Sequence, residues 1–302
     1  MHIIKSISEY HQLANLPKPE HPLVSLVDYS QVNYQTDGDE ISIVSGHYSI
    51  ALKRGMSGKF RYGQQPYDFD EGLMSFVSPG QVITVKVRRE PNPHPTGWIL
   101  LIHPDFLWNT PLATRIKNYE FFGYHIHEAL FLSEKEEKSM IGIMENIREE
   151  YHSNIDQFSQ NIIISQVEVL LSYAERFYQR QFITRKISNH EILGRLETIL
   201  RRHFAQDNLA SVGLPVVEEI ADQLNVSSGY LSSLLKIHTG LNTQQHIHEK
   251  LIEKAKEKLS TTQLSVSEIA YSLGFEHSQS FSTNGTDLEQ IQKTSVAFEW
   301  LQ

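Results

Sequence analysis

The sequence of 302 residues contains no cysteine. Disulfide bonds and thiolate metal sites are therefore excluded, and the composition is compatible with a reducing compartment. Long hydrophobic runs are also missing, since the run GWILLI at 97–102 is far shorter than the roughly 20 residues of a membrane-spanning helix. Because the N-terminus also lacks the apolar core of a signal peptide, we expect a cytoplasmic protein with no membrane partner.

Positive charge is scarce. The net charge is −9, and residues 190–302 hold 9 Lys and Arg against 14 Asp and Glu. Nucleic-acid-binding domains usually carry the opposite balance, because contacts to phosphate supply much of their affinity. The charge balance therefore argues against binding to DNA or RNA.

The chain changes texture near residue 130. Residues 1–130 are punctuated by Gly, Pro and Asn, and three stretches at 40–55, 58–87 and 97–107 read as short strands joined by turns. Strict alternation in VITVKV at 82–87 indicates a half-buried antiparallel strand. Many short strands at close spacing are typical of a β-barrel or a β-sandwich.

Two helices are predicted after this region. The first begins at Ser133, with Glu136 in the capping-box position, and carries one apolar face made of Met140, Ile141, Met144 and Ile147. The second, at 156–182, has a wider apolar surface than one contact requires: Ile162, Ile163, Ile164, Val167, Val169, Leu170 and Leu171. Two interpretations stay open, a helical hairpin within one chain and a hairpin that also contacts a second copy. The polar, basic stretch 183–190 is a candidate linker.

The C-terminal region contains an internal sequence repeat. The segment EEIADQLNV at 218–226 resembles SEIAYSLGF at 267–275, with Ala221 and Ala270 in equivalent places. Both segments have the small residue and the turn residue that a helix-turn-helix needs where its two helices meet. In the first segment, Asn225 suits a left-handed turn. Its predicted core is Ile220, Leu224, Val226, Leu231 and Leu234.

Ser227 is the predicted N-cap of the second helix of this first motif. Its expected exposed residues are Ser228, Gly229, Ser232, Ser233 and Lys236. Serine can bond base edges or phosphates, and lysine suits a phosphate. A generic helical corner would show the same pattern in one copy, but two copies favour a DNA-reading unit.

At this point the sequence resembles the AraC/XylS-type transcriptional regulators. The matching segments are 220–242, 250–259 and 264–282. The resemblance implies an α+β protein with a cupin-like β-barrel sensor, a helical dimerisation segment and an all-α domain with two helix-turn-helix motifs. The corresponding ranges are 1–130 for the barrel, 131–182 for the hairpin, 183–190 for the linker, 191–282 for the double motif and 283–302 for a tail.

The resemblance also implies two recognition helices in successive major grooves, about 34 Å apart. By position, the DNA-binding residues would be Ser227, Ser228, Gly229, Ser232, Ser233, Lys236, Ser278 and Gln279. The implied partners are double-stranded DNA, a second copy of the chain and an unidentified small-molecule effector, with RNA polymerase as a further candidate. No cofactor is expected.

The sequence departs from the family pattern after Ser282. The next inward position after Phe281 is Gly285, preceded by Asn284, and Asn-Gly is a turn signal. The family's basic helix and Gly-x-Ser-Pro segment are absent from 283–302. We hypothesise a change of reading frame, which the coding DNA would disprove if no nearby frame restored the pattern. Whether the altered tail abolishes DNA binding or only weakens it stays open.

Two other functions compete with DNA-binding regulation. A cupin-type metalloenzyme would use His125, His127 and Glu128, but these residues follow the strands and lead into a helix, so no metal site is predicted. The motifs GxSxG, HExxH and the phosphate loop are absent, and no catalytic residue or enzymatic activity is expected. The second competing function is a ligand-binding dimer that has lost DNA binding.

Overall fold

The structure is a computed structural model that divides into two compact units, Met1–Ser188 and Asn189–Gln302. It describes residues 1–34, 40–54, 72–86, 96–125, 128–153, 156, 158–184, 186–206 and 209–273. Each unit is described by itself below.

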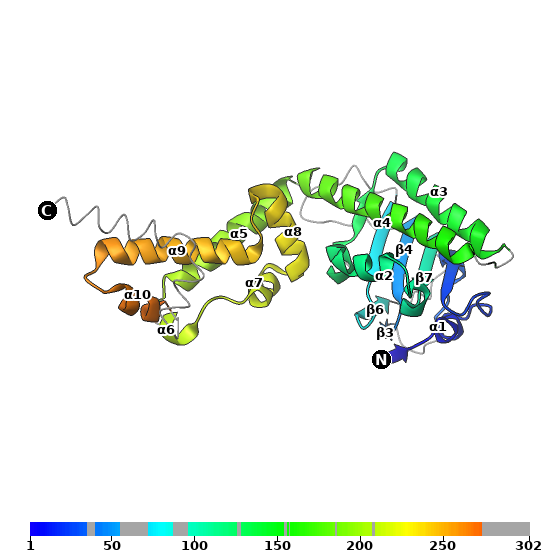
Figure 1. Ribbon diagram of the computed structural model, residues 1–302, viewed down its shortest axis with the longest axis horizontal. Helices are drawn as coiled ribbons and strands as arrows, with labels where there is room; N and C mark the ends of the chain where they lie inside the picture. The colour runs from blue at the N-terminus through cyan, green and yellow to red at the C-terminus, as the bar shows by residue number, and fades with distance from the viewer. Residues whose placement is uncertain are drawn as a thin grey trace. The chain divides into compact units, whose positions relative to one another are not determined.

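The first unit contains two β-sheets (Figure 1). One has three strands in the order β1 (His2–Ile4), β3 (Glu40–Ser45) and β6 (Val82–Lys86), with β1 parallel to β3 and β6 antiparallel to it. The other has five antiparallel strands. Their order is β2 (Val24–Asp28), β7 (Thr96–Ile102), β4 (Tyr48–Arg54), β5 (Gly72–Val77) and β8 (Leu130–Leu132).

Strands are present in all three predicted stretches, at 40–45 and 48–54, at 72–77 and 82–86, and at 96–102. In β6 the exposed Val82 and Thr84 alternate with the half-buried Ile83 and Val85, as the sequence alternation predicts. The central strands β4 and β7 are buried along most of their length, because both neighbour other strands within the five-stranded sheet. Residues 58–71 of the predicted strand region lie outside the described residues.

One predicted strand is wrong in its second part. The stretch 97–107 continues the strand only to Ile102, and Pro104–Leu107 forms the 3-10 helix η2. His103 ends the strand, because its Nδ1 accepts the Asp105 N–H at 3.2 Å and Pro104 cannot donate to a ladder. Further short helices interrupt the strand-rich region: α1 (Ile7–Leu13), η1 (Tyr29–Gln31), α2 (Leu112–Arg115), η3 (Ile116–Asn118) and η4 (Glu120–Gly123).

Helices α3 (Glu134–Tyr151) and α4 (Ser159–Thr184) run side by side and pack on the strands (Figure 1). The capping box of Ser133 and Glu136 is confirmed. Met140, Met144 and Ile147 are buried as predicted, whereas Ile141 is only half-buried and Ile143 is buried in addition.

In the residues that the structure describes, the second unit contains helices and no strands. Its helices are α5 (Lys186–Phe204, which begins three residues before the unit boundary), α6 (Leu209–Val212), α7 (Val217–Leu224), α8 (Ser228–Thr239), α9 (Thr243–Thr261) and α10 (Val266–Ser272). Ile247, Leu251 and Ala255 of α9 are buried as predicted, whereas Ile252 is half-buried. The candidate linker 183–190 contains the end of α4 and the start of α5.

Candidate nucleic-acid interface

Helices α7 and α8 form a helix-turn-helix. Asn225 occupies the turn with φ 59° and ψ 44°, the left-handed conformation that asparagine tolerates better than most residues. The backbone N–H of Val226 donates to the Ala221 carbonyl at 3.0 Å, which closes the end of α7. Ala221 is buried, so the small side chain lets the two helices approach each other. The predicted motif is therefore present.

Ser227 begins α8 as its N-cap. Its hydroxyl accepts the Tyr230 N–H at 3.2 Å, and the residue is buried. Tyr230 is itself buried, together with the predicted core residues Leu231 and Leu234. Ser227 thus fixes the start of the helix, and the structure gives it a role in the fold rather than on the exposed surface.

The remaining predicted residues of α8 differ in exposure. Lys236 is exposed, and Ser228, Gly229 and Ser233 are half-buried. Ser232 is also half-buried, but its Oγ lies 3.1 Å from the Oγ1 of the buried Thr243 at the start of α9. This hydrogen bond ties α8 to α9 and uses the hydroxyl that we expected to contact DNA.

The sequence did not reveal the residues that brace the motif from outside. Arg195 on α5 donates to the carbonyl of Gln223 at 2.7 Å, near the end of α7. The Nδ2 of Asn189 lies 3.0 Å from His238 Nε2 near the end of α8. Because these contacts join residues 28 and 49 positions apart, no local sequence pattern signals them.

Charge on the motif is uneven. Glu218, Glu219 and Asp222 are exposed on α7, whereas Lys236 is the one lysine or arginine of α8. Acidic residues in the first turn of α7 favour the helix dipole. They would however repel a phosphate backbone placed beside them. Within the first motif, the surface of α8 is therefore better suited to a phosphate backbone than that of α7.

The second predicted motif is described only in its first helix. Ser265 and Glu268 form a capping box at the start of α10. Ile269, Ala270 and Leu273 are buried, as Ile220, Ala221 and Leu224 are in α7. The predicted DNA-binding residues Ser278 and Gln279, and the whole tail 283–302, lie outside the described residues.

The histidine-rich alternative site has a role in the fold. The buried Glu128 accepts the His125 backbone N–H at 2.6 Å through Oε2, while its carbonyl accepts the Tyr178 hydroxyl at 3.2 Å. His127 is not among the described residues. In the part of the chain that the structure describes, no three His, Asp or Glu residues are grouped to hold a metal ion. In that same part, no helix is long and apolar enough to cross a membrane.

Comparison with known proteins finds similarity in the C-terminal part of the chain. Residues 220–287 match the helix-turn-helix domain family, which covers the whole of α7 to α10 except the first residues of α7. The chain is 29% identical over 147 residues to the transcriptional activator RhaS of Salmonella schwarzengrund, covering 48% of each chain. It is 30% identical over 122 residues to the uncharacterized transcriptional regulator YfiF of Bacillus subtilis, covering 40% of this chain and 35% of that one.

The C-terminal unit therefore contains a segment similar to known helix-turn-helix domains, as the resemblance to AraC/XylS-type regulators predicts. The chain spans about half or less of the length of these curated relatives. A solved C-terminal domain of the response regulator yesN of Fusobacterium nucleatum is 30% identical, covering 32% of this chain and 86% of that chain, with a TM-score of 0.27. The match to the helix-turn-helix domain family extends to residue 287, beyond Ser282, where we predicted that the family pattern stops.

Proposed function

We propose that this protein is a sequence-specific DNA-binding transcriptional regulator. The observation that carries the proposal is the α7–α8 motif, whose left-handed Asn225 and capped α8 have the geometry of a DNA-reading unit. Its position in a segment that matches the helix-turn-helix domain family supports the same function. We propose that the chain is not an enzyme, because its named relatives are transcriptional regulators.

In this proposal α8 enters the major groove and its outward residues do different work. Ser228 and Ser233 would bond base edges, and Gly229 would let the helix approach the bases closely. Lys236 would contact a phosphate. Ser227 and Ser232 would hold α8 in place through Tyr230 and Thr243, without touching DNA. Ser278 and Gln279 remain the proposed readers of the second motif.

The test is fluorescence anisotropy with DNA from upstream of the gene, run across salt concentrations. Lys236→Ala should weaken binding to every sequence and lower the salt slope by about 1, because one phosphate contact is lost. The matched control is Lys135→Ala, which removes an exposed lysine from α3 in the first unit. Equal slopes for Lys236→Ala and wild type would remove α8 from the interface.

We further propose that the first unit is a cupin-like sensor that responds to a small molecule and dimerises through α4. Several apolar side chains of α4 are exposed, among them Ile162 at 44%, Val169 at 45% and Tyr173 at 37%. Their spacing of seven and four residues places them on one face of the helix, opposite the buried Ile163, Val167 and Leu170. Two copies of this face would cover each other, and RNA polymerase stays a further candidate partner.

A specific observation favours a second function, a ligand-binding dimer without DNA binding. The C-terminal region has an excess of acidic residues, and α7 exposes three carboxylates. The anisotropy measurement separates the two functions when it includes a variant whose last twenty residues follow the family pattern. Specific binding of DNA by both the wild type and this variant supports the regulator. Binding by the variant alone supports the dimer that does not bind DNA.

A further inference from the structure

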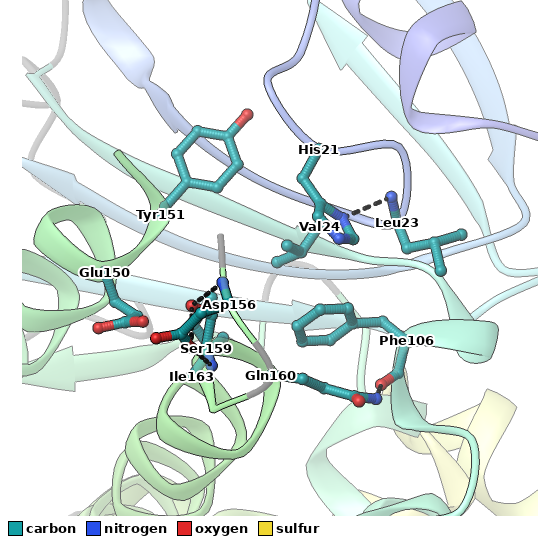
Figure 2. Close-up of a pocket in the computed structure, with 10 residues that line it drawn as sticks. All are labelled: His21, Leu23, Val24, Phe106, Glu150, Tyr151, Asp156, Ser159, Gln160 and Ile163. Atoms are coloured by element: carbon teal, nitrogen blue, oxygen red, sulfur yellow. Dashed lines mark hydrogen bonds between the residues drawn. The ribbon is translucent and has the colours of Figure 1, made fainter. Parts of the chain in front are cut away.

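A pocket of about 250 Å³ lies between the helical hairpin and the edge of the five-stranded sheet (Figure 2). Four segments supply its walls: the approach to β2, helix η2, the end of α3 and the start of α4. This volume is slightly below the range of sites for drug-sized ligands, so the pocket suits a smaller molecule. None of the DNA-reading residues takes part in it.

One side of the pocket is acidic. Glu150 and Asp156 lie on the same side of it, as Figure 2 shows. The Glu150 carboxylate makes no ion pair or hydrogen bond with any residue that the structure describes. Asp156 Oδ1 accepts the N–H groups of Phe158 at 2.7 Å and Ser159 at 3.1 Å and the Ser159 hydroxyl at 3.3 Å, and none of these bonds uses Oδ2. The acidic side therefore lacks a countercharge within the described lining, where neither lysine nor arginine occurs.

His21 does not supply the missing positive charge. Burial lowers the pKa of its imidazole, which favours the neutral ring near pH 7. Its Nδ1 accepts the Leu23 N–H at 3.1 Å, so the proton of the neutral ring sits on Nε2. His152 follows the lining residue Tyr151 in the chain, and its Nδ1 lies 2.8 Å from Glu20 Oε1. A ligand would thus meet two carboxylates and a neutral donor.

The other side of the pocket is apolar and aromatic. Phe106 packs edge-on against His21, with ring centroids 5.5 Å apart. Val24 and Ile163, both buried, complete this wall. A protonated amine gains from carboxylates and from the face of an aromatic ring, while its hydrocarbon part gains from the apolar wall. An anionic ligand would be repelled by Glu150 and Asp156.

We propose that this pocket binds a small protonated amine that carries an aromatic or apolar group. The ammonium group lies against Glu150 and Asp156, and the apolar group lies against Phe106, Val24 and Ile163. That the amine is the effector of transcription rests on the function proposed above, whereas its binding does not.

Isothermal titration of the full-length chain without DNA tests the binding. The probes are phenethylamine, its neutral counterpart 2-phenylethanol and the anion 3-phenylpropionate. Phenethylamine should bind at least about tenfold more tightly than 2-phenylethanol, and 3-phenylpropionate should not bind, because only the amine offers a positive charge to the two carboxylates. Binding of the anion as tight as that of the amine, or no binding of the amine at millimolar concentration, would overturn the proposal.

Three variants locate the site. Glu150→Gln should weaken the binding of the amine about tenfold, since one carboxylate charge is lost while the shape of the side chain is kept. Asp156→Asn should do the same while keeping an oxygen for the N–H groups of Phe158 and Ser159. Glu149→Gln is the control, because Glu149 is exposed on α3 and does not line the pocket.

Thermal unfolding establishes which variants are folded before the affinities are compared. Unchanged amine affinity in both pocket variants would overturn the proposal, as would an equal loss in Glu149→Gln. Because the titration contains no DNA, failure here leaves the DNA-binding function untouched, and failure of DNA binding leaves this result standing.

Discussion

The two units stabilise themselves by different means. In the first unit, the buried polar residues include His11, His47, Glu128 and Glu137, all of them able to carry charge. In the described part of the second unit, the buried polar residues are Asn189, Ser227 and Thr243, which are uncharged. The first unit should therefore respond to pH and to small charged ligands, whereas the helix-turn-helix should depend on packing and on helix caps.

The largest expected effect comes from the two cores. Leu234→Ala in α8 and Leu171→Ala in α4 each empty a fully buried site, and each should cost about 3 kcal/mol of the free energy of unfolding. Hydrogen exchange followed by mass spectrometry, resolved by peptide, should show faster exchange only in the unit that carries the substitution. Equal acceleration in both units would contradict the division into separate units.

The second effect is the pH dependence of the first unit. Burial is the main cause that lowers the pKa of His47 to about 4, and the neighbouring His103 and His11 are smaller causes of the same shift. Because the folded pKa lies below the unfolded value, stability is fully present above pH 6.5 and is lost as the pH falls toward 4. The loss should approach about 3 kcal/mol.

Urea denaturation at several pH values measures this effect, with His47→Gln as the comparison. The variant should lose most of the dependence that the wild type shows between pH 6.5 and 4. A wild-type stability that stays constant in this range would contradict the assignment of a neutral, buried His47. In the second unit, His246 shares the direction of the shift, but it is only half-buried, so a smaller effect is expected there.

A smaller effect tests the turn and the cap of the DNA-reading motif. Ser227→Ala should cost about 1 kcal/mol, because the Tyr230 N–H loses its acceptor inside a buried cap. Asn225→Ala should cost about 1 kcal/mol, whereas Asn225→Gly should be nearly neutral, since glycine adopts the left-handed conformation freely. Urea denaturation measures all three variants. Equal losses for alanine and glycine at position 225 would show that the conformation of the turn is not the cause.

The smallest effect on folding, and a specific one on assembly, is expected at the exposed face of α4. Val169→Glu should leave the monomer folded, because the residue is 45% exposed, but it should separate a dimer that uses this face. Light scattering after size exclusion measures the mass. The control Ser172→Glu changes an exposed polar residue of the same helix. A wild-type protein that is monomeric at high concentration would remove the dimer from the account.

Local signals were read correctly from the sequence, and contacts between distant residues were not. The capping box at Ser133, the left-handed turn at Asn225 and the cap at Ser227 each depend on neighbours within three or four residues. The hydrogen bond between Ser232 and Thr243 joins two helices, and no local pattern around Ser232 signals it. Helix α1 was missed although Ser6 and Glu9 form a capping box, because seven residues carry too little periodicity.

The amine pocket could not have been predicted either. Its walls come from residues as far apart as His21 and Ile163, and the sequence shows no pattern that joins them. Closure of two sheets into the predicted cupin-like barrel depends on contacts between distant strands. Alternation within one strand does not specify those contacts. The helix-turn-helix could be predicted from the sequence, because the residues that define it lie within about twenty consecutive positions.

The most direct test of the central claim is a selection from randomised DNA with wild type and Ser233→Arg. If α8 reads bases, wild type should enrich a defined sequence, and Ser233→Arg should change the preferred bases within one part of that site, with guanine favoured because arginine bonds it bidentately. Identical preferences in both proteins, or no enrichment by the wild type, would contradict base reading by α8.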